Sequence, residues 1–157
     1  MVTLCVEKPN RREVIGLVAE LDKYLQSLYP PESNYLLDVH TLMGEDILFL
    51  TAKDGERYVG CGAVKMVKEG QYGEIKRMYV VPDERGKRIG YMILAELERL
   101  ALQAGFKILK LETGIYQREA ISLYEKFGFQ RTAWFGEYKD DPLCLFFEKR
   151  IGPAVEN

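Results

Sequence analysis

A basic, glycine-containing loop is the part of the sequence whose residue types point most directly to chemistry. It reads RGKRIG over residues 85–90, between a predicted strand that ends at Val81 and a predicted helix that begins at Gly90. Glycines let the backbone curl so that several N–H groups point one way, and a helix N-terminus adds unpaired donors and a partial positive charge. The loop therefore predicts a pocket for a phosphate-type anion, with a solvated basic turn as the alternative.

Two common kinds of phosphate-binding loop are excluded by the same residues. The loop has neither the G-x-x-x-x-G-K-[ST] pattern of a P-loop nor the G-x-G-x-x-G pattern of a dinucleotide site. A nucleotide-binding regulator would need a P-loop or a DNA-binding helix, and the sequence contains neither pattern.

Hydrophobic periodicity predicts the elements that must position this loop. Alternating apolar residues predict strands, and apolar residues three and four positions apart predict helices. The expected strands are 3–7, 47–53, 58–68, 74–81, 108–113, 129–135 and 143–149, and the expected helices are 10–28, 35–42, 90–104 and 119–126. Asn10 and Glu13 are expected to form a capping box at the first helix. Three meandering strands followed by a strand–helix–strand unit predict a mixed sheet whose parallel pair flanks helix 90–104.

Two stretches of the chain together resemble a known family. The strand residues 78–82, MYVVP, lead into the loop 85–90 as in the acetyl-CoA-binding motif of the GCN5-related N-acetyltransferase (GNAT) superfamily, which is a strand, then [RQ]-x-x-G-x-[GA], then a helix. Arg85 and Gly90 occupy the first and last positions of that motif. Arg88 replaces its usual glycine, and the neighbouring Gly86 can supply the flexibility instead.

The second stretch lies at the expected distance along the chain. Residues 117–120, QREA, stand for the family's N-x-x-A, and residues 123–129, LYEKFGF, resemble its L-Y-x-x-x-G-F. Gln117 replaces the frequent asparagine and keeps an amide with a longer reach. The whole order of elements fits the family from about Thr3 to Arg150.

The resemblance implies a fold, a cosubstrate and a reaction. The fold is α/β (α+β) of the GNAT type: one domain over residues 1–157, with a mixed, mostly antiparallel twisted sheet of about seven strands, a central parallel pair and about four flanking helices. The cosubstrate is acetyl-CoA, whose pantetheine arm pairs with the strand 74–81 like an added strand. The implied cofactor-binding residues are Met78, Tyr79, Val80, Arg85, Gly86, Lys87, Arg88, Ile89, Gly90, Tyr91, Gln117 and Ala120.

Tyr124 and Glu74 are the expected catalytic residues. By resemblance, the Tyr124 hydroxyl points at the cofactor sulfur, where a neutral tyrosine can donate a proton to the departing thiolate. A tyrosine of the core is the alternative for Tyr124. Some members of the family use a glutamate at the place of Glu74 as the base. Strict strand alternation puts Glu74 on one face with Lys76, Met78 and Val80, and four residues of strand span roughly 13 Å. Direct contact with the reacting atoms would therefore need a bulge and bridging waters. A surface ion pair is the alternative role for Glu74.

The acceptor site is predicted less sharply. Segment 28–42 lies where family members carry substrate-covering helices, and it holds Tyr29, Glu32, Asp38 and the single histidine, His40. Acids there could attract a cationic amine, although a solvated helix face has the same pattern, and His40 has no evident catalytic partner. Trp134, Phe135 and Tyr138 are expected to shape the acceptor pocket or to belong to the core. The candidate substrate-binding residues are Tyr29, Glu32, Trp134 and Tyr138.

Composition restricts the classes of partner. Of the 157 residues, 29% are charged, and the formal net charge is −2, so no overall basic field attracts nucleic acid or anionic lipid. Three cysteines without C-x-x-C spacing predict neither a disulfide framework nor a metal site. No apolar run is long enough for a membrane span, and residues 1–10 do not resemble a signal peptide. We therefore expect a cytoplasmic protein, and the resemblance suggests a homodimer.

Three functions remain open at this level. The leading one is transfer of an acetyl group from acetyl-CoA to a primary amine of a small molecule or amino acid, by direct attack in a ternary complex. The second is acetylation of protein N-termini or lysines. The third is a non-catalytic acyl-CoA-binding module, against which Tyr124 argues because binding alone needs no acid at sulfur.

Overall fold

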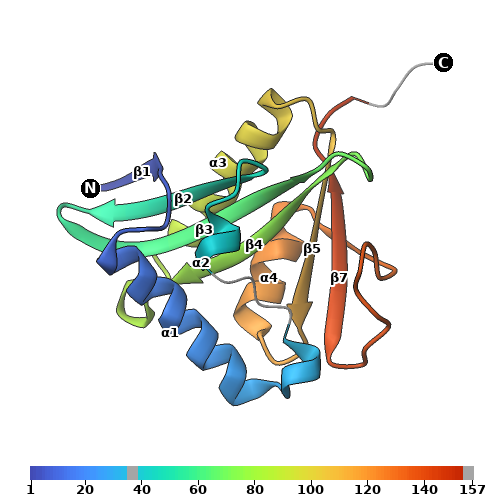
Figure 1. The fold of residues 1–157 in the computed structure, drawn as a ribbon, viewed down its shortest axis with the longest axis horizontal. Coiled ribbons are helices and arrows are strands. Elements are labelled where there is room, and N and C mark those ends of the chain that lie inside the picture. Colours follow the sequence, from blue (N-terminus) through green and yellow to red (C-terminus); the bar gives the residue numbers. More distant parts are fainter. Residues whose placement is uncertain (35–38, 154–157) are drawn as a thin grey trace.

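The structure is a computed structural model that describes residues 1–34 and 39–153 (Figure 1). Its helices are α1 (Arg12–Leu28), α2 (Val39–Leu42), α3 (Ile89–Gln103) and α4 (Arg118–Phe127), with short 3₁₀ helices at Pro31–Ser33 and Pro82–Glu84. Its strands are β1 (Val2–Val6), β2 (Ile47–Asp54), β3 (Arg57–Val67), β4 (Tyr72–Val80), β5 (Ile108–Gly114), β6 (Gln130–Thr132) and β7 (Cys144–Arg150). No helix within the described residues is both long enough and apolar enough to cross a membrane.

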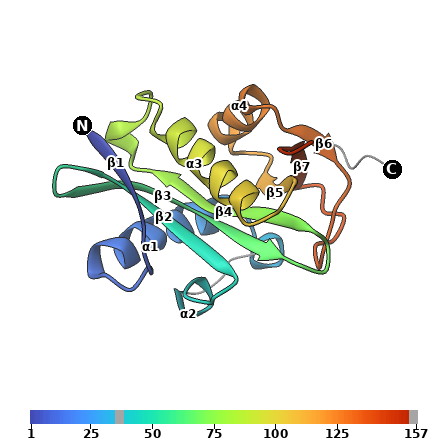
Figure 2. The ribbon, with the colours of Figure 1, turned by 90° about the horizontal axis from the view of Figure 1, so that it is seen from above.

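One seven-stranded sheet forms the middle layer of the molecule. The strand order is β1-β2-β3-β4-β5-β7-β6, and β4 and β5 are the parallel pair joined by the α3 crossover. Figure 2 shows α3 and α4 on one face of the sheet and α1 and α2 on the other. The expected mixed sheet with a central parallel pair and four helices is confirmed.

The parallel pair is short. Its ladder joins only Gly73–Ile75 of β4 to Leu109–Leu111 of β5. Beyond these residues the two strands diverge in the direction in which both run, as Figure 1 shows. The diverging ends carry Met78 and Gly114, so the sheet is open where the sequence places its chemistry.

Apolar stripes on α1 and α3 form the core on the two faces of the sheet. Val14, Leu17, Val18 and Leu21 of α1 are buried at helical spacing, and so are Ile89, Ile93, Leu94, Leu97 and Ala101 of α3. Glycine in β3 lets α3 approach closely, because a Cβ atom on Gly62 would lie 2.8 Å from Ile93. Leu97 and Phe49 are among the largest fully buried side chains.

Two expectations for local structure are wrong. Helix α1 begins at Arg12, and Arg11 rather than Asn10 precedes it, without a side-chain cap. The chain turns at Pro9 and Asn10, so the first helical hydrogen bond runs from the Ile15 N–H to the Arg11 carbonyl at 2.9 Å. The capping box therefore does not form.

The second error concerns the strand predicted over residues 129–135. The strand β6 covers only Gln130–Thr132, because after Thr132 the chain leaves the sheet edge. Phe135 then packs in a separate aromatic cluster with Tyr72, Cys144 and Phe146, while Trp134 is 52% exposed. Of the predicted helix 35–42, the structure describes only α2, and Asp38 lies outside the described residues.

Candidate active site

A long groove runs between β4, the N-terminus of α3 and α4. Its volume is about 880 Å³. It is lined by Leu21, Tyr24, Met78, Tyr79, Val80, Glu84, Arg85, Gly86, Arg88, Ile89, Gly90, Tyr91, Tyr116, Gln117, Arg118, Glu119, Ala120, Ser122, Leu123, Tyr124 and Lys126. The structure thus brings together every residue expected to bind the cofactor except Lys87.

One end of the groove has the features of an anion site. Arg88 precedes α3 in the left-handed region, with φ +65°, and Gly86 has φ +83°, so the loop curls towards the helix N-terminus. The N–H groups of the first turn of a helix have no intrahelical partners. The Arg85 Nε donates to the Val80 carbonyl at 2.9 Å, which holds that side chain along the groove.

Lys87 points elsewhere. Its Nζ forms an ion pair with Glu84 at 2.9 Å, and its side chain is largely exposed. Arg88, by contrast, lines the groove and lies over the Tyr91 ring, with 4.9 Å between the guanidinium carbon and the ring centroid. The two neighbouring cations therefore differ in their access to an anion in the groove.

A bulge in β4 changes the faces that its side chains occupy. Ala63 of β3 pairs with Lys76 and Cys61 pairs with Tyr79, so Gly62 alone faces two residues of β4, and Arg77 has φ +58°. Arg77 and Tyr79 contact Asp22 and Glu20 of α1. The Met78 side chain lies on the face of the sheet that α3 covers. A Cβ atom on Gly62 would touch both the Met78 sulfur and Ile93 of α3, so these two side chains are on the same side of β3.

The expected strict alternation along β4 is therefore wrong. The extra residue of a bulge shifts the side-chain pattern by one position. Glu74 and Lys76 share the α1 face with Arg77 and Tyr79, whereas Met78 faces α3.

A second, smaller pocket opens on the α1 face of the sheet. Its volume is about 80 Å³. It is lined by Leu21, Leu25, Tyr29, Ser33, Asn34, Ile75, Lys76, Arg77, Met78, Glu112, Thr113, Gly114, Gln117, Tyr124 and Tyr138. Four of these residues line the groove as well: Leu21, Met78, Gln117 and Tyr124. The two cavities therefore meet where β4 and β5 diverge.

Tyr124 lies at this junction. Its side chain is buried, and its ring packs against Phe129 and Phe147, with centroid distances of 5.9 and 6.5 Å. Burial, aided by the nearby Glu112 carboxyl, raises the pKa of the Tyr124 hydroxyl well above its usual range. The hydroxyl is therefore neutral near pH 7 and can donate a hydrogen bond to either cavity.

Glu112 of β5 is the carboxyl group that lines the small pocket, and the sequence analysis missed it. Burial raises the pKa of Glu112 to about 7, although a hydrogen bond with Cys144 and the Lys76 charge act in the opposite direction. No clear signal in the sequence marks it, because Glu112 falls with Lys110 at the charged positions of an alternating strand. Lys76, Arg77 and Asn34, which also line the pocket, were not predicted to do so.

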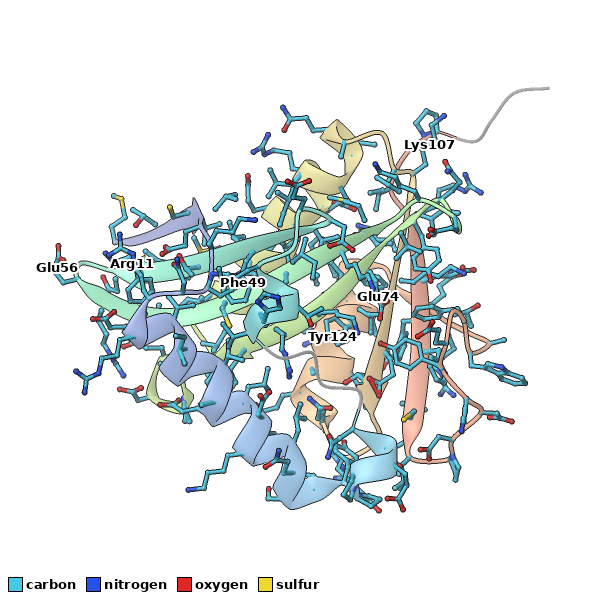
Figure 3. The ribbon with its side chains drawn as sticks, viewed as in Figure 1. Arg11, Phe49, Glu56, Glu74, Lys107 and Tyr124 are labelled. Carbon is cyan, nitrogen blue, oxygen red and sulfur yellow. The ribbon has the colours of Figure 1, made fainter. Side chains whose placement is uncertain are left out.

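Glu74 is buried next to the pocket but does not line it. Its carboxylate accepts a hydrogen bond from the Tyr138 hydroxyl and forms an ion pair with the Lys76 Nζ at 3.1 Å. The Lys76 Nζ also donates to the Tyr138 hydroxyl at 2.9 Å. Figure 3 labels Glu74, of β4, and Tyr124, of α4, and Tyr124 lies nearer the end at which β4 and β5 separate.

The other predicted acceptor residues divide into two groups. Tyr29 and Tyr138 line the small pocket, whereas Glu32 and Trp134 line neither cavity. Glu32 and His40 are exposed to solvent. The two predicted acceptor residues that line the pocket therefore come from the end of α1 and from the loop before β7, rather than from a strand.

Tyr29 occupies its place because residue 114 has no side chain. A Cβ atom on Gly114 would lie 1.9 Å from the Tyr29 hydroxyl, which accepts a hydrogen bond from the Tyr116 N–H at 3.0 Å. We expect Gly114→Ala to displace Tyr29 and lower the free energy of unfolding by about 1–3 kcal/mol, the usual cost of overpacking. Urea denaturation measures this change.

Gly16→Ala is the matched control for that prediction. Gly16 lies within α1, and its Cβ would meet no atom within 4 Å, so the same substitution should stabilise the protein by about 0.5–1 kcal/mol. Equal effects at both positions would contradict the close contact between Tyr29 and Gly114.

Comparison with known proteins agrees with this geometry. The model of the Acetyltransferase (GNAT) family matches residues 15–129. An IAA acetyltransferase of Azospirillum brasilense is 50% identical over 150 residues, which cover 96% of this chain and 98% of the relative.

Solved structures resemble the chain over almost its whole length. An acyl-CoA N-acyltransferase from Klebsiella pneumoniae has a TM-score of 0.82 at 36% identity, covering 97% of this chain and 99% of that chain. The PaiA N-acetyltransferase of Thermoplasma acidophilum, solved in complex with coenzyme A, shares the fold with a TM-score of 0.70 at 20% identity, covering 94% and 99% of the two chains. Because the family model spans more than half of the chain and a close relative matches nearly all of it, the chain belongs to the acetyltransferase (GNAT) family and is an acyltransferase.

Proposed function

We propose that the protein transfers an acetyl group from acetyl-CoA to the primary amine of a small molecule or amino acid, by direct attack in a ternary complex. One observation carries this proposal: the groove and the small pocket share Tyr124 in their lining. A donor in the groove and an acceptor in the small pocket would face each other there. A binding module without catalysis would need only the groove.

The groove fits acetyl-CoA in the kind of donors it offers. In this proposal Arg85, Arg88 and the first-turn N–H groups of α3 bind the diphosphate, since charged donors and helix N-termini favour such anions. The backbone at Met78–Val80 pairs with the pantetheine arm, and the Gln117 amide and Ala120 border it. Acetyl-CoA supplies the activated acyl group.

Residues at the junction would act on the reacting atoms. A backbone N–H of Met78 or Val80 stabilises the negative charge on the thioester oxygen, as fixed donors do for oxyanions. The neutral Tyr124 hydroxyl donates its proton to the departing sulfur. Both groups belong to the chain itself, so the protein needs no side chain from a partner for this step.

The small pocket favours a compact acceptor over a protein chain. Its volume of about 80 Å³ holds a few non-hydrogen atoms, and its wall is polar on the side of Ser33, Asn34 and Tyr138. Because the Azospirillum brasilense relative is called an IAA acetyltransferase, IAA belongs among the acceptors to be tested.

A free-thiol assay tests the function. Purified protein is mixed with acetyl-CoA and a panel of small amines, amino acids, IAA and peptides with free N-termini or lysines. CoA release that requires a small amine supports the proposal, and release with peptides alone would assign the acceptor to proteins. Binding of acetyl-CoA without release by any acceptor would indicate a sensor.

Arg88 and Lys87 provide a test of the anion site. We expect Arg88→Ala to weaken CoA binding about 10-fold or more, because hydrogen bonds to charged groups contribute about 1.5–3 kcal/mol. Lys87→Ala removes the same charge from the exposed pair with Glu84 and should change the affinity less than about threefold. Isothermal titration calorimetry with CoA measures both, and equal losses would mean that the loop acts only through its net charge.

We also propose that the enzyme acts in the cytoplasm as a homodimer. All three cysteines are free thiols, and Cys61 and Cys144 are buried, which suits a reducing compartment. Sedimentation velocity would test the dimer.

A further inference from the structure

The small pocket contains one carboxyl group among the described residues that line it, and that group belongs to Glu112. In the β4–β5 ladder Ile75 pairs with Leu111, so Glu112 lies beside Lys76, immediately after the last paired residues. Glu112 therefore stands where the strands begin to separate, in the cavity that Tyr124 also reaches. A group at this position can contact an acceptor that is directed at the junction.

Charged and titratable groups face Glu112 from every element around it. Lys76 and Glu74 lie on β4, Tyr124 on α4, Cys144 on β7 and Asp141 in the loop before β7. Tyr29 and Tyr138 complete the surroundings. The attraction of Lys76 and the hydrogen bond with Cys144 do not outweigh burial, so the carboxyl keeps a pKa near neutrality. Such a pKa suits a group that must accept and then release a proton near pH 7.

Glu74, the base expected from the family resemblance, is placed differently. Its carboxylate already binds the Tyr138 hydroxyl and the Lys76 ammonium, and it lies behind these side chains rather than at the pocket wall. Because Tyr138 and Lys76 both line the pocket, Glu74 holds two lining side chains in position. This is a positioning role.

We propose that Glu112, and not Glu74, accepts the proton of the acceptor amine, a role that rests on the proposed acetyltransferase function. The Glu112 carboxylate takes one proton from the acceptor ammonium, and the freed nitrogen lone pair forms the C–N bond to the acetyl carbon. The C–S bond breaks, and its electron pair takes the proton of the Tyr124 hydroxyl. The nitrogen returns its second proton to Tyr124, and Glu112 releases its own to solvent. Glu112 thus releases one proton to solvent for each amide formed.

The test is the pH profile of kcat/KM for the wild type, Glu112→Gln and Glu74→Gln, between pH 5.5 and 9, with an amine acceptor found in the panel. The wild-type rate should rise with an inflection near pH 7, where Glu112 loses its proton. Glu112→Gln should lose about 100-fold or more at pH 7, as expected for removal of a general base. It should also lose the inflection and recover activity as the pH approaches the pKa of the amine.

Glu74→Gln is the matched control, since it removes a buried carboxylate one strand away. It should lower the rate but retain the inflection near pH 7. Calorimetry with CoA should give affinities within about twofold for all three proteins, which separates loss of chemistry from loss of folding or cofactor binding.

Three results would overturn the proposal. One is a Glu112→Gln enzyme that keeps the inflection and a rate within about threefold of the wild type. Another is loss of the inflection in Glu74→Gln instead. The third needs no variant: a wild-type profile without an inflection between pH 6 and 8. If the wild type binds CoA but acetylates no acceptor, the proposed function itself fails, and the role of Glu112 fails with it.

Discussion

Replacing Tyr124 by Phe is expected to lower turnover by about 100-fold or more while leaving the affinity for acetyl-CoA within about threefold. The hydroxyl is the one group of this ring that can donate a proton at the junction of the two cavities, and proton donation of this kind contributes about 10²–10⁴-fold. The ring itself packs against Phe129 and Phe147, so Phe should fill the same space. Steady-state kinetics and calorimetry measure the two quantities separately.

Tyr58→Phe is the control for this substitution. Tyr58 also has a hydroxyl, which donates to Glu7 at 3.3 Å, and Tyr58 lines neither cavity. Its removal should leave turnover unchanged. If Tyr124→Phe also leaves turnover unchanged, Tyr124 has no part in the mechanism.

The second large effect concerns stability. The free energy of unfolding of Glu112→Gln should increase relative to that of the wild type as the pH rises. Between pH 4 and pH 8 the difference between the two proteins should shift by about 2–4 kcal/mol in favour of the variant. Burial raises the pKa of Glu112 to about 7 in the folded protein, from an ordinary value of 4.5. Between these values the folded state binds more protons than the unfolded state, so the contribution of Glu112 to stability falls as the pH rises through 7 and levels off above about pH 8. Glutamine has the same shape and does not ionise.

Urea denaturation of both proteins at pH 4, 5, 6, 7 and 8 measures this effect. Other titrating groups contribute equally to the two proteins, so the difference between their free energies of unfolding isolates Glu112. A difference that does not change with pH would mean that Glu112 ionises as easily in the folded protein as in the unfolded chain. An enzyme that keeps a costly carboxylate in its core is consistent with the catalytic use of that group.

The sequence was sufficient for the features that depend on local residues. The curled loop before α3 follows from Gly86 and the order of strand, loop and helix, and the groove contains all but one of the residues named for it. The order of elements along the chain and the parallel pair around the crossover also follow, because alternation and helical spacing are local signals and a strand–helix–strand unit makes its two strands parallel.

Features that depend on a partner strand could not be predicted in this way. The bulge at Arg77 arises where Gly62 of β3 faces two residues of β4, and no residue of β4 alone marks it. The pocket around Glu112 depends on side chains from β4, α4 and β7, which meet only after folding. The missed cap at Asn10 shows the same limit on a smaller scale, since the path of the chain before α1 decides which residue precedes the helix.

The short β4–β5 ladder has a consequence for how the protein holds together. Three residues on each strand form the only backbone ladder, within the described residues, between the half of the sheet made of β1, β2, β3 and β4 and the half made of β5, β7 and β6. A ligand that contacts both β4 and α4 would bridge the halves and add its binding energy to folding, about 2.7 kcal/mol at a concentration 100 times its dissociation constant. The supply of acyl donor would then set how long each molecule resists local opening and proteolysis.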